Sequence, residues 1–102
     1  METLKQALEK IETPLRFSAG NDFRNLTLVR NLEEPLRKKI AGLRDVLPQK
    51  VTDNQRAGRM AMRLAALDGI LSGFDAASPE DRKRRISEGL ACIDALKGEL
   101  AG

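Results

Sequence analysis

Apolar residues recur along most of the chain at intervals of three and four, the spacing that places side chains on one face of an α-helix. No stretch shows the alternation of apolar and polar residues that is typical of a β-strand. We therefore predict an all-α fold, a small bundle of about five helices. The first expected helix covers residues 3–12, and the second is capped by Asn21 or Asp22 and continues to Leu32. The third runs from Glu33 to Pro48. A longer fourth helix begins at Thr52 or Asp53 and has an apolar row that reaches Phe74, and the last helix runs from Ser78 to Leu100.

Two prolines are expected to end helices. Proline lacks the backbone N–H that a helix interior requires, so Pro14 should end the first helix and Pro48 the third. Residues 48–53 then read as a loop, in which Thr52 or Asp53 can cap the next helix.

The last two predicted helices carry the clearest periodicity. In the first of them the spacing of 4, 3, 4 and 3 is typical of a helix packed along another helix, and it is set by Met60, Leu64, Leu67, Leu71 and Phe74. Gly73 is placed to end that helix, and Ser78 with Pro79 is a strong start signal for the next. Because the connection is short, residues 52–100 should form a long antiparallel hairpin, following shorter helices in 1–48.

Length and composition agree with one helical domain. The chain has 102 residues, 41% hydrophobic and 32% charged, which is a globular balance. Its only aromatic residues are three phenylalanines, so the core must be aliphatic and each buried side chain contributes less area. We expect modest stability alone, and a fragment of a longer protein that docks on a larger body.

Charge and cysteine content narrow the cellular context. The net charge of +3 arises entirely in residues 1–50, which carry ten Lys or Arg against seven Asp or Glu. The single Cys92 cannot form an intrachain disulfide, and residues 1–12 do not resemble a secretory signal. No apolar run approaches the ~20 residues that span a bilayer, so we expect a cytoplasmic protein without membrane contact.

Residue inventory excludes several kinds of chemistry. The chain has no histidine and one cysteine, which excludes zinc clusters and Ser-His or Cys-His catalysis. Its glycines form neither of the phosphate-binding patterns G-x-x-x-x-G-K-[ST] and G-x-G-x-x-G. We predict no catalytic residue, no metal site and no cofactor in this chain.

Paired acids could act as acid and base or hold a hard cation, but they lie at predicted helix starts. Acids there favour the helix dipole, and each is followed four residues later by a cation. The pairs so predicted are Glu33 with Arg37, Glu34 with Lys38, Glu80 with Arg84 and Asp81 with Arg85. The basic runs 37–39 and 82–85 are nucleic-acid candidates that the same acids partly neutralise, so we favour a solvated surface.

The best-focused cationic feature is a stripe of Arg56, Arg59 and Arg63, which spacings of 3 and 4 place on one helix face. The stripe is a candidate contact for phosphates or for an acidic partner. Alternatively, the arginine stems simply flank the apolar seam of that helix while the guanidinium groups stay hydrated.

Two stretches, Pro14–Ile40 (PLRFSAGNDFRNLTLVRNLEEPLRKKI) and Phe74–Leu90 (FDAASPEDRKRRISEGL), resemble the helical N-terminal extension before the wedge domain of some bacterial RecG-type DNA helicases. In that family the ATPase motifs and the branched-DNA wedge lie downstream, and nothing corresponding to them occurs in residues 1–102. No functional residue is therefore carried over.

The resemblance implies a non-catalytic accessory domain of an ATP-dependent DNA helicase in DNA repair and recombination. Such a domain would pack against the wedge and motor domains of the same polypeptide and contact branched DNA weakly. The alternative is a free-standing helical protein–protein interaction or dimerisation module, in which an exposed apolar seam binds a partner or a second copy.

Overall fold

The computed structural model describes residues 3–20 and 32–101, and in these residues the fold is all-α. Four α-helices and one short 3-10 helix make up the described chain, and no strand occurs in it. Their bounds are α1 Leu4–Gly20, α3 Glu33–Lys50, α4 Asn54–Leu71, the 3-10 helix η1 Phe74–Ala76, and α5 Pro79–Ala101. The helix predicted over residues 21–32 lies almost wholly outside the described residues.

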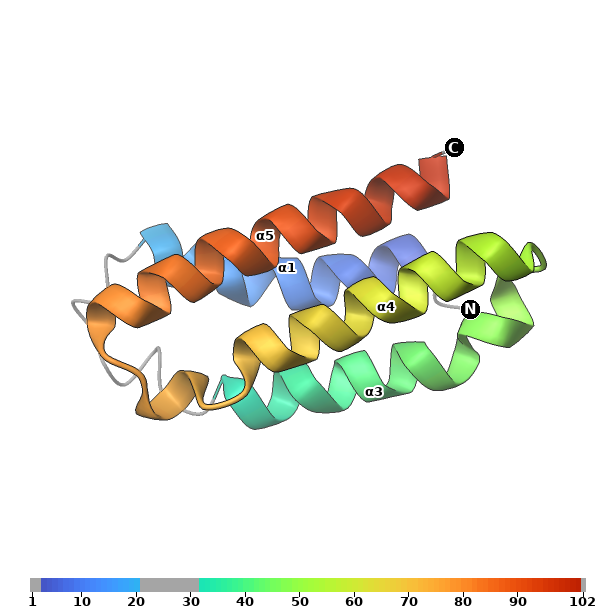
Figure 1. The fold of residues 1–102 in the computed structure, drawn as a ribbon. Coiled ribbons are helices and arrows are strands. Elements are labelled where there is room, and N and C mark those ends of the chain that lie inside the picture. Colours follow the sequence, from blue (N-terminus) through green and yellow to red (C-terminus); the bar gives the residue numbers. More distant parts are fainter. Residues whose placement is uncertain (1–2, 21–31, 102) are drawn as a thin grey trace.

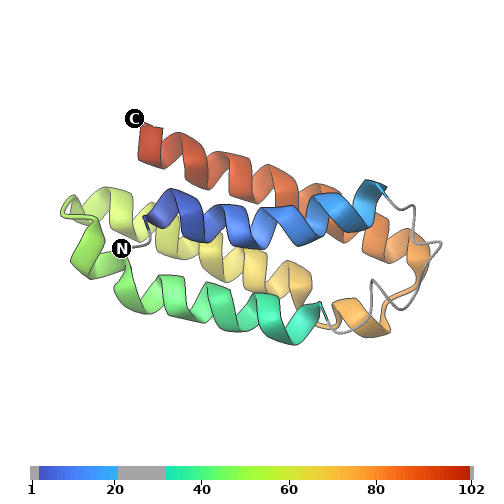
Figure 2. The same cartoon turned by 180° about the vertical axis from the view of Figure 1, so that it is seen from behind.

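The four helices form an elongated bundle in which successive described helices run in opposite directions (Figure 1). Each helix has two neighbours: α1 packs against α3 and α5, and α4 packs against the same two helices. Figure 2 shows α1 and α3 side by side on the face opposite to α4 and α5. This arrangement leaves each helix with one face inside the bundle and one outside.

Aliphatic residues fill the interior, as their periodicity predicts. The buried positions on α4 are Met60, Leu64, Leu67 and Leu71, and α3 and α1 contribute matching rows of leucine and isoleucine. On α5 the row contains Ile86, Ile93 and Leu96. Phe74 is fully buried and is the one aromatic side chain in the described core.

Local capping explains where three of the helices begin. The Asp53 carboxylate accepts hydrogen bonds from the backbone N–H groups of Gln55 (2.9 Å) and Arg56 (3.3 Å), which confirms one of the two predicted caps of α4. The Ser78 hydroxyl accepts from the N–H of Asp81 (3.2 Å) at the start of α5, as predicted. Thr3 and Gln6 form a reciprocal capping box before α1, a signal that our sequence reading missed.

The predicted ends of the first and third helices are wrong. Pro14 lies inside α1, which continues to Gly20, and Pro48 lies in the last turn of α3, which ends at Lys50. A proline inside a helix costs about 3 kcal/mol, but continuing α1 buries Leu15 completely, and one such burial returns about 1.5–3 kcal/mol. Burial on the apolar face of the helix therefore offsets much of the cost of its local break signal.

The predicted end of the fourth helix near Gly73 is confirmed, but Phe74, which we counted in its apolar row, lies beyond it. Helix α4 ends at Leu71, because Gly73 adopts a left-handed conformation (φ 79°) that turns the chain. Phe74 thus enters the core from η1 rather than from α4. The prediction that Phe74 is a core residue is confirmed, but the prediction that it lies on the fourth helix is wrong.

Gly89 lies where α5 packs closely against α4 and α1. A Cβ atom at this buried position would lie 3.4 Å from a methyl of Leu67 on α4 and 3.5 Å from a methyl of Leu15 on α1. These distances are van der Waals contact, so a side chain larger than alanine would have to displace one of these leucines. Gly42 on α3 has no such neighbours, because a Cβ there would meet nothing within 4 Å.

We expect Gly89→Leu to lower the free energy of unfolding by about 1–3 kcal/mol through overpacking, despite the better helix propensity of leucine. The matched variant Gly42→Leu should raise it by up to about 1 kcal/mol, since it gains propensity without a clash. Urea denaturation followed by circular dichroism measures both. Equal effects of the two substitutions would contradict the close approach at Gly89.

Candidate docking surface

The basic run 82–85 does not form an open cationic patch. Arg82 is buried, and its guanidinium donates to the backbone carbonyls of Phe74 (3.1 Å) and Asp75. Arg85 donates to the carbonyls of Ile70 (2.8 Å) and Ser72 (2.7 Å), near the end of α4. Two of the four cations therefore tie the α4–α5 connection together, a role that neither the phosphate nor the solvated-surface interpretation foresaw.

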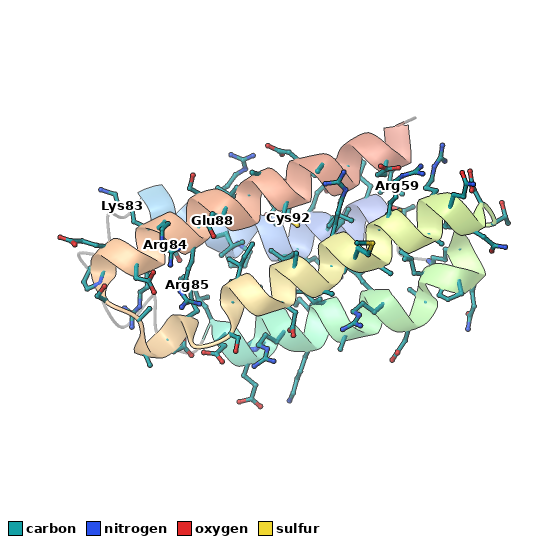
Figure 3. The ribbon with its side chains drawn as sticks, viewed as in Figure 1. Arg59, Lys83, Arg84, Arg85, Glu88 and Cys92 are labelled. Atoms are coloured by element: carbon teal, nitrogen blue, oxygen red, sulfur yellow. The ribbon has the colours of Figure 1, made fainter. Side chains whose placement is uncertain are left out.

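Arg84 is exposed but paired. It contacts the carboxylates of Asp81 and Glu88 (3.1 Å), whereas the predicted partner was Glu80, so that pairing was wrong. The predicted pair of Asp81 with Arg85 is confirmed (2.8 Å). Hydrogen bonds from Arg85 and Arg84 lower the pKa of Asp81 below its ordinary value. Figure 3 shows Arg84, Arg85 and Glu88 together on the first half of α5.

The acids at the start of α3 have structural partners. Glu33 pairs with Arg37 (3.5 Å) and Glu34 with Lys38 (3.4 Å), as predicted. The Glu33 carboxylate also accepts hydrogen bonds from the backbone N–H groups of Gly73 and Asp75. These bonds lower the pKa of Glu33, and the bond from Gly73 is the largest cause.

Asp75 completes this network from the opposite side. Its carboxylate accepts from the backbone N–H groups of Leu32 (3.2 Å) and Glu33 (3.3 Å), and so caps α3 from the α4–α5 connection. Arg37 in turn forms a bidentate bond with Asp68 on α4 (2.9 and 3.3 Å). These groups join segments 31 to 43 residues apart, and periodicity could not have paired them.

The stripe of Arg56, Arg59 and Arg63 gathers around one carboxylate, Glu99 of α5. Arg59 binds Glu99 in bidentate fashion, with both N–O distances 3.1 Å, and this bond is the main reason that the pKa of Glu99 is lowered. Electrostatic attraction from Arg63 and Arg56 lowers the pKa of Glu99 further. One acid thus faces three cations.

The other two arginines of the stripe are left without a bonded partner. The Nε of Arg56 is buried and has no hydrogen-bond partner within residues 3–20 and 32–101. The guanidinium of Arg63 makes no hydrogen bond or ion pair with the described part of the chain. Asp53 also attracts Arg56 and Arg59 electrostatically, so this end of the α4–α5 face places three arginines near two carboxylates and keeps a small excess of positive charge.

A groove of about 590 Å³ runs along the outer face between α4 and α5, beside the stripe. Arg59 and Arg63 line one side of it. The remaining lining is apolar and comprises Met62, Ala66, Ile70, Ala91, Cys92 and Ala95. Met62 is 75% exposed, an unusual position for a large apolar side chain.

Cys92 lies in the floor of this groove between the two helices (Figure 3). Its thiol donates to the backbone carbonyl of Arg63 (3.0 Å), and burial raises the pKa of the thiol. A raised pKa leaves little reactive thiolate near neutral pH. Cys92 is thus a partly buried structural residue, as predicted.

A buried ion pair was missed by the sequence reading. Glu12 of α1 is buried, and its carboxylate accepts from Lys97 of α5 (2.6 Å) and from Arg16 (2.8 Å). The bond from Lys97 is the largest cause of the lowered pKa of Glu12. The spacing of Glu12 and Arg16 signalled the local pair, but nothing in the sequence pointed to Lys97, which is 85 residues away.

Neither a metal site nor a membrane span is present in the described residues. No group of three or more Cys, Asp or Glu side chains is arranged to hold an ion there. None of the described helices is long and apolar enough to cross a membrane.

No family model, no curated protein and no solved structure is significantly similar to this chain.

We expect Arg82→Met to destabilise the fold by about 1–3 kcal/mol, because the carbonyls of Phe74 and Asp75 would lose their donor. Arg84→Met should leave the unfolding midpoint nearly unchanged, because Arg84 is exposed and its ion pairs with Asp81 and Glu88 lie at the surface. Thermal unfolding compares the two variants. A larger loss from Arg84→Met would mean that the run acts through its exposed members.

The Glu12 pair should make stability depend on acid pH. The folded-state pKa of Glu12 is lowered, so its contribution is complete above the unfolded pKa of about 4.3 and is lost as pH falls through the folded-state value. We expect Glu12→Gln to be less stable than the wild type at neutral pH and the difference to shrink below pH ~4. Urea denaturation across this range measures it, and a constant difference would contradict the role of the pair.

Proposed function

We propose that this chain is a non-catalytic helical accessory domain of an ATP-dependent DNA helicase acting on branched DNA in repair and recombination. In this role it packs against the wedge and motor domains of the same polypeptide. One observation carries the proposal: the two stretches that resemble the N-terminal extension of RecG-type helicases come together at one end of the bundle.

The contact between these stretches is direct. The N–H groups of Leu32 and Glu33, in the first stretch, donate to the Asp75 carboxylate in the second. The buried Gly89 of the second stretch packs beside Leu15 of the first. The end of α1, the start of α3 and the α4–α5 connection all lie at the left of Figure 1. The described parts of the two stretches are thus in contact with each other, and this contact is what supports the proposal.

The alternative function is a free-standing helical interaction or dimerisation module. The apolar groove of the α4–α5 hairpin favours this reading, because such a groove is a docking feature in any protein context.

The length of the native protein distinguishes the two functions. An antibody raised against residues 1–102 should detect a polypeptide far larger than 11.3 kDa in the source cells, and the purified polypeptide should hydrolyse ATP when branched DNA is added. Removing residues 1–102 should reduce fork unwinding while leaving ATP hydrolysis measurable. A native species of about 11.3 kDa would refute the helicase proposal and favour the free-standing module.

We expect the isolated chain to bind a DNA fork weakly, without sequence preference, and 10-fold or more weaker at about 200 mM than at about 50 mM salt. Replacing Arg56, Arg59 and Arg63 together with Ala should change fork affinity less than about twofold, since Glu99 already neutralises part of the stripe and the adjoining groove is apolar. Fluorescence anisotropy of a labelled fork measures both. A large loss in the triple variant would assign the stripe to phosphate contact.

A further inference from the structure

The outer face of α4 and α5 combines an apolar groove with an unbalanced positive charge at one end. Neither feature is needed by the bundle itself, because the core rows of both helices point to the opposite side. Together, the apolar groove and the positive charge define the chemistry of a ligand that this face can bind.

The dimensions of the groove suit a single α-helix. Its lining on α4 extends from Arg59 to Ile70, and a rise of about 1.5 Å per residue makes this about 16 Å, or three helical turns. Three of its six apolar residues are alanines, and small side chains let helix axes approach to about 8 Å. The exposed Met62 supplies an adaptable apolar contact at the edge.

The positive charge at one end of the groove indicates which polar side chains a bound helix would carry. Of the three arginines around Glu99, only Arg59 has a bonded acidic partner, and Arg63 lines the groove without one. The start of α4, where the stripe begins, is the positive end of its helix dipole, but the Asp53 carboxylate already caps it, so the excess charge comes from the arginines. The opposite end of the groove has no such excess, because Arg84 is paired with Asp81 and Glu88.

We propose that this groove binds an amphipathic helix of a partner protein that carries an apolar stripe and several acidic side chains at one end. The apolar stripe covers Met62, Ala66 and Ala91, and the acidic end lies against Arg63 and Arg56. A second copy of this chain fits less well, because two copies of the face would each bring an excess of arginine. DNA fits less well because the groove floor offers phosphates no polar group.

The inference goes beyond the helicase proposal and does not depend on it, since it concerns only the chemistry of one surface. It is tested with the 102-residue chain and synthetic helical peptides of about 18 residues, a length of about 27 Å. One peptide has a leucine and alanine stripe with three glutamates in its first turns. A second replaces the glutamates with lysines, and a third replaces the apolar stripe with serine and glutamine.

We expect the glutamate peptide to bind at least about tenfold more tightly than the lysine peptide, and the stripe-less peptide not to bind measurably. Arg63→Glu should reverse the preference between the two charged peptides. Met62→Asp should weaken both by about tenfold or more, because it places a charge against the apolar stripe. Arg44→Glu is the matched control: it reverses an exposed arginine on α3 outside the groove and should change neither peptide's affinity by more than about twofold.

Isothermal titration calorimetry measures the affinities, and circular dichroism of each variant shows that it is folded. Four outcomes would overturn the proposal. In the first, the glutamate peptide does not bind, and in the second, it binds but Arg63→Glu and Met62→Asp leave its affinity unchanged. In the third, sedimentation shows a homodimer that Met62→Asp dissociates. In the fourth, the chain binds fork DNA and Arg63→Glu abolishes that binding. The last two outcomes would identify a second copy or a nucleic acid as the occupant, and the helicase proposal would be judged separately by native protein length.

Discussion

Burial of four aliphatic rows against one another is the interaction on which the rest of the structure depends. With Phe74 as its one described aromatic side chain, the core gains its area from many leucines and isoleucines, and such a core requires close helix packing. Gly89 permits that approach where α5 meets both Leu15 and Leu67. The same requirement extends α1 past Pro14, because the residues beyond the proline complete its buried row.

Close packing of antiparallel helices in turn requires a tight connection whose backbone groups are satisfied. At the end of α4, Arg85 supplies donors to two carbonyls, and Arg82 does so for η1. Asp75 in the same connection caps α3, so one short segment holds the ends of three helices. Much of the charge that looks available for a ligand is therefore used to join the helices.

The outer face of α4 and α5 carries side chains that do not serve the core. They include an exposed methionine, several alanines and three arginines near two carboxylates, Glu99 and Asp53. Because the helices that carry this face are already packed, a partner would find it preformed and little ordering entropy would be lost on binding. Docking of a partner helix is the role that we propose for this face, whether the chain acts inside a helicase or alone.

The sequence by itself determined the helical class, most of the core rows and the Ser78 cap, and it narrowed the cap of α4 to Thr52 or Asp53, because these depend on periodicity and on hydrogen bonds within three residues. It misplaced the helix ends at Pro14 and Pro48 and assigned Phe74 to the wrong helix; at Pro14, burial of Leu15 offsets the local break signal. Spacing predicted ion pairs within one helix, such as Glu33 with Arg37, but partners on different helices were decided by the tertiary structure alone. Arg59 meets Glu99 across 40 residues and Glu12 meets Lys97 across 85, and such pairs exist only after the apolar rows have brought their helices together.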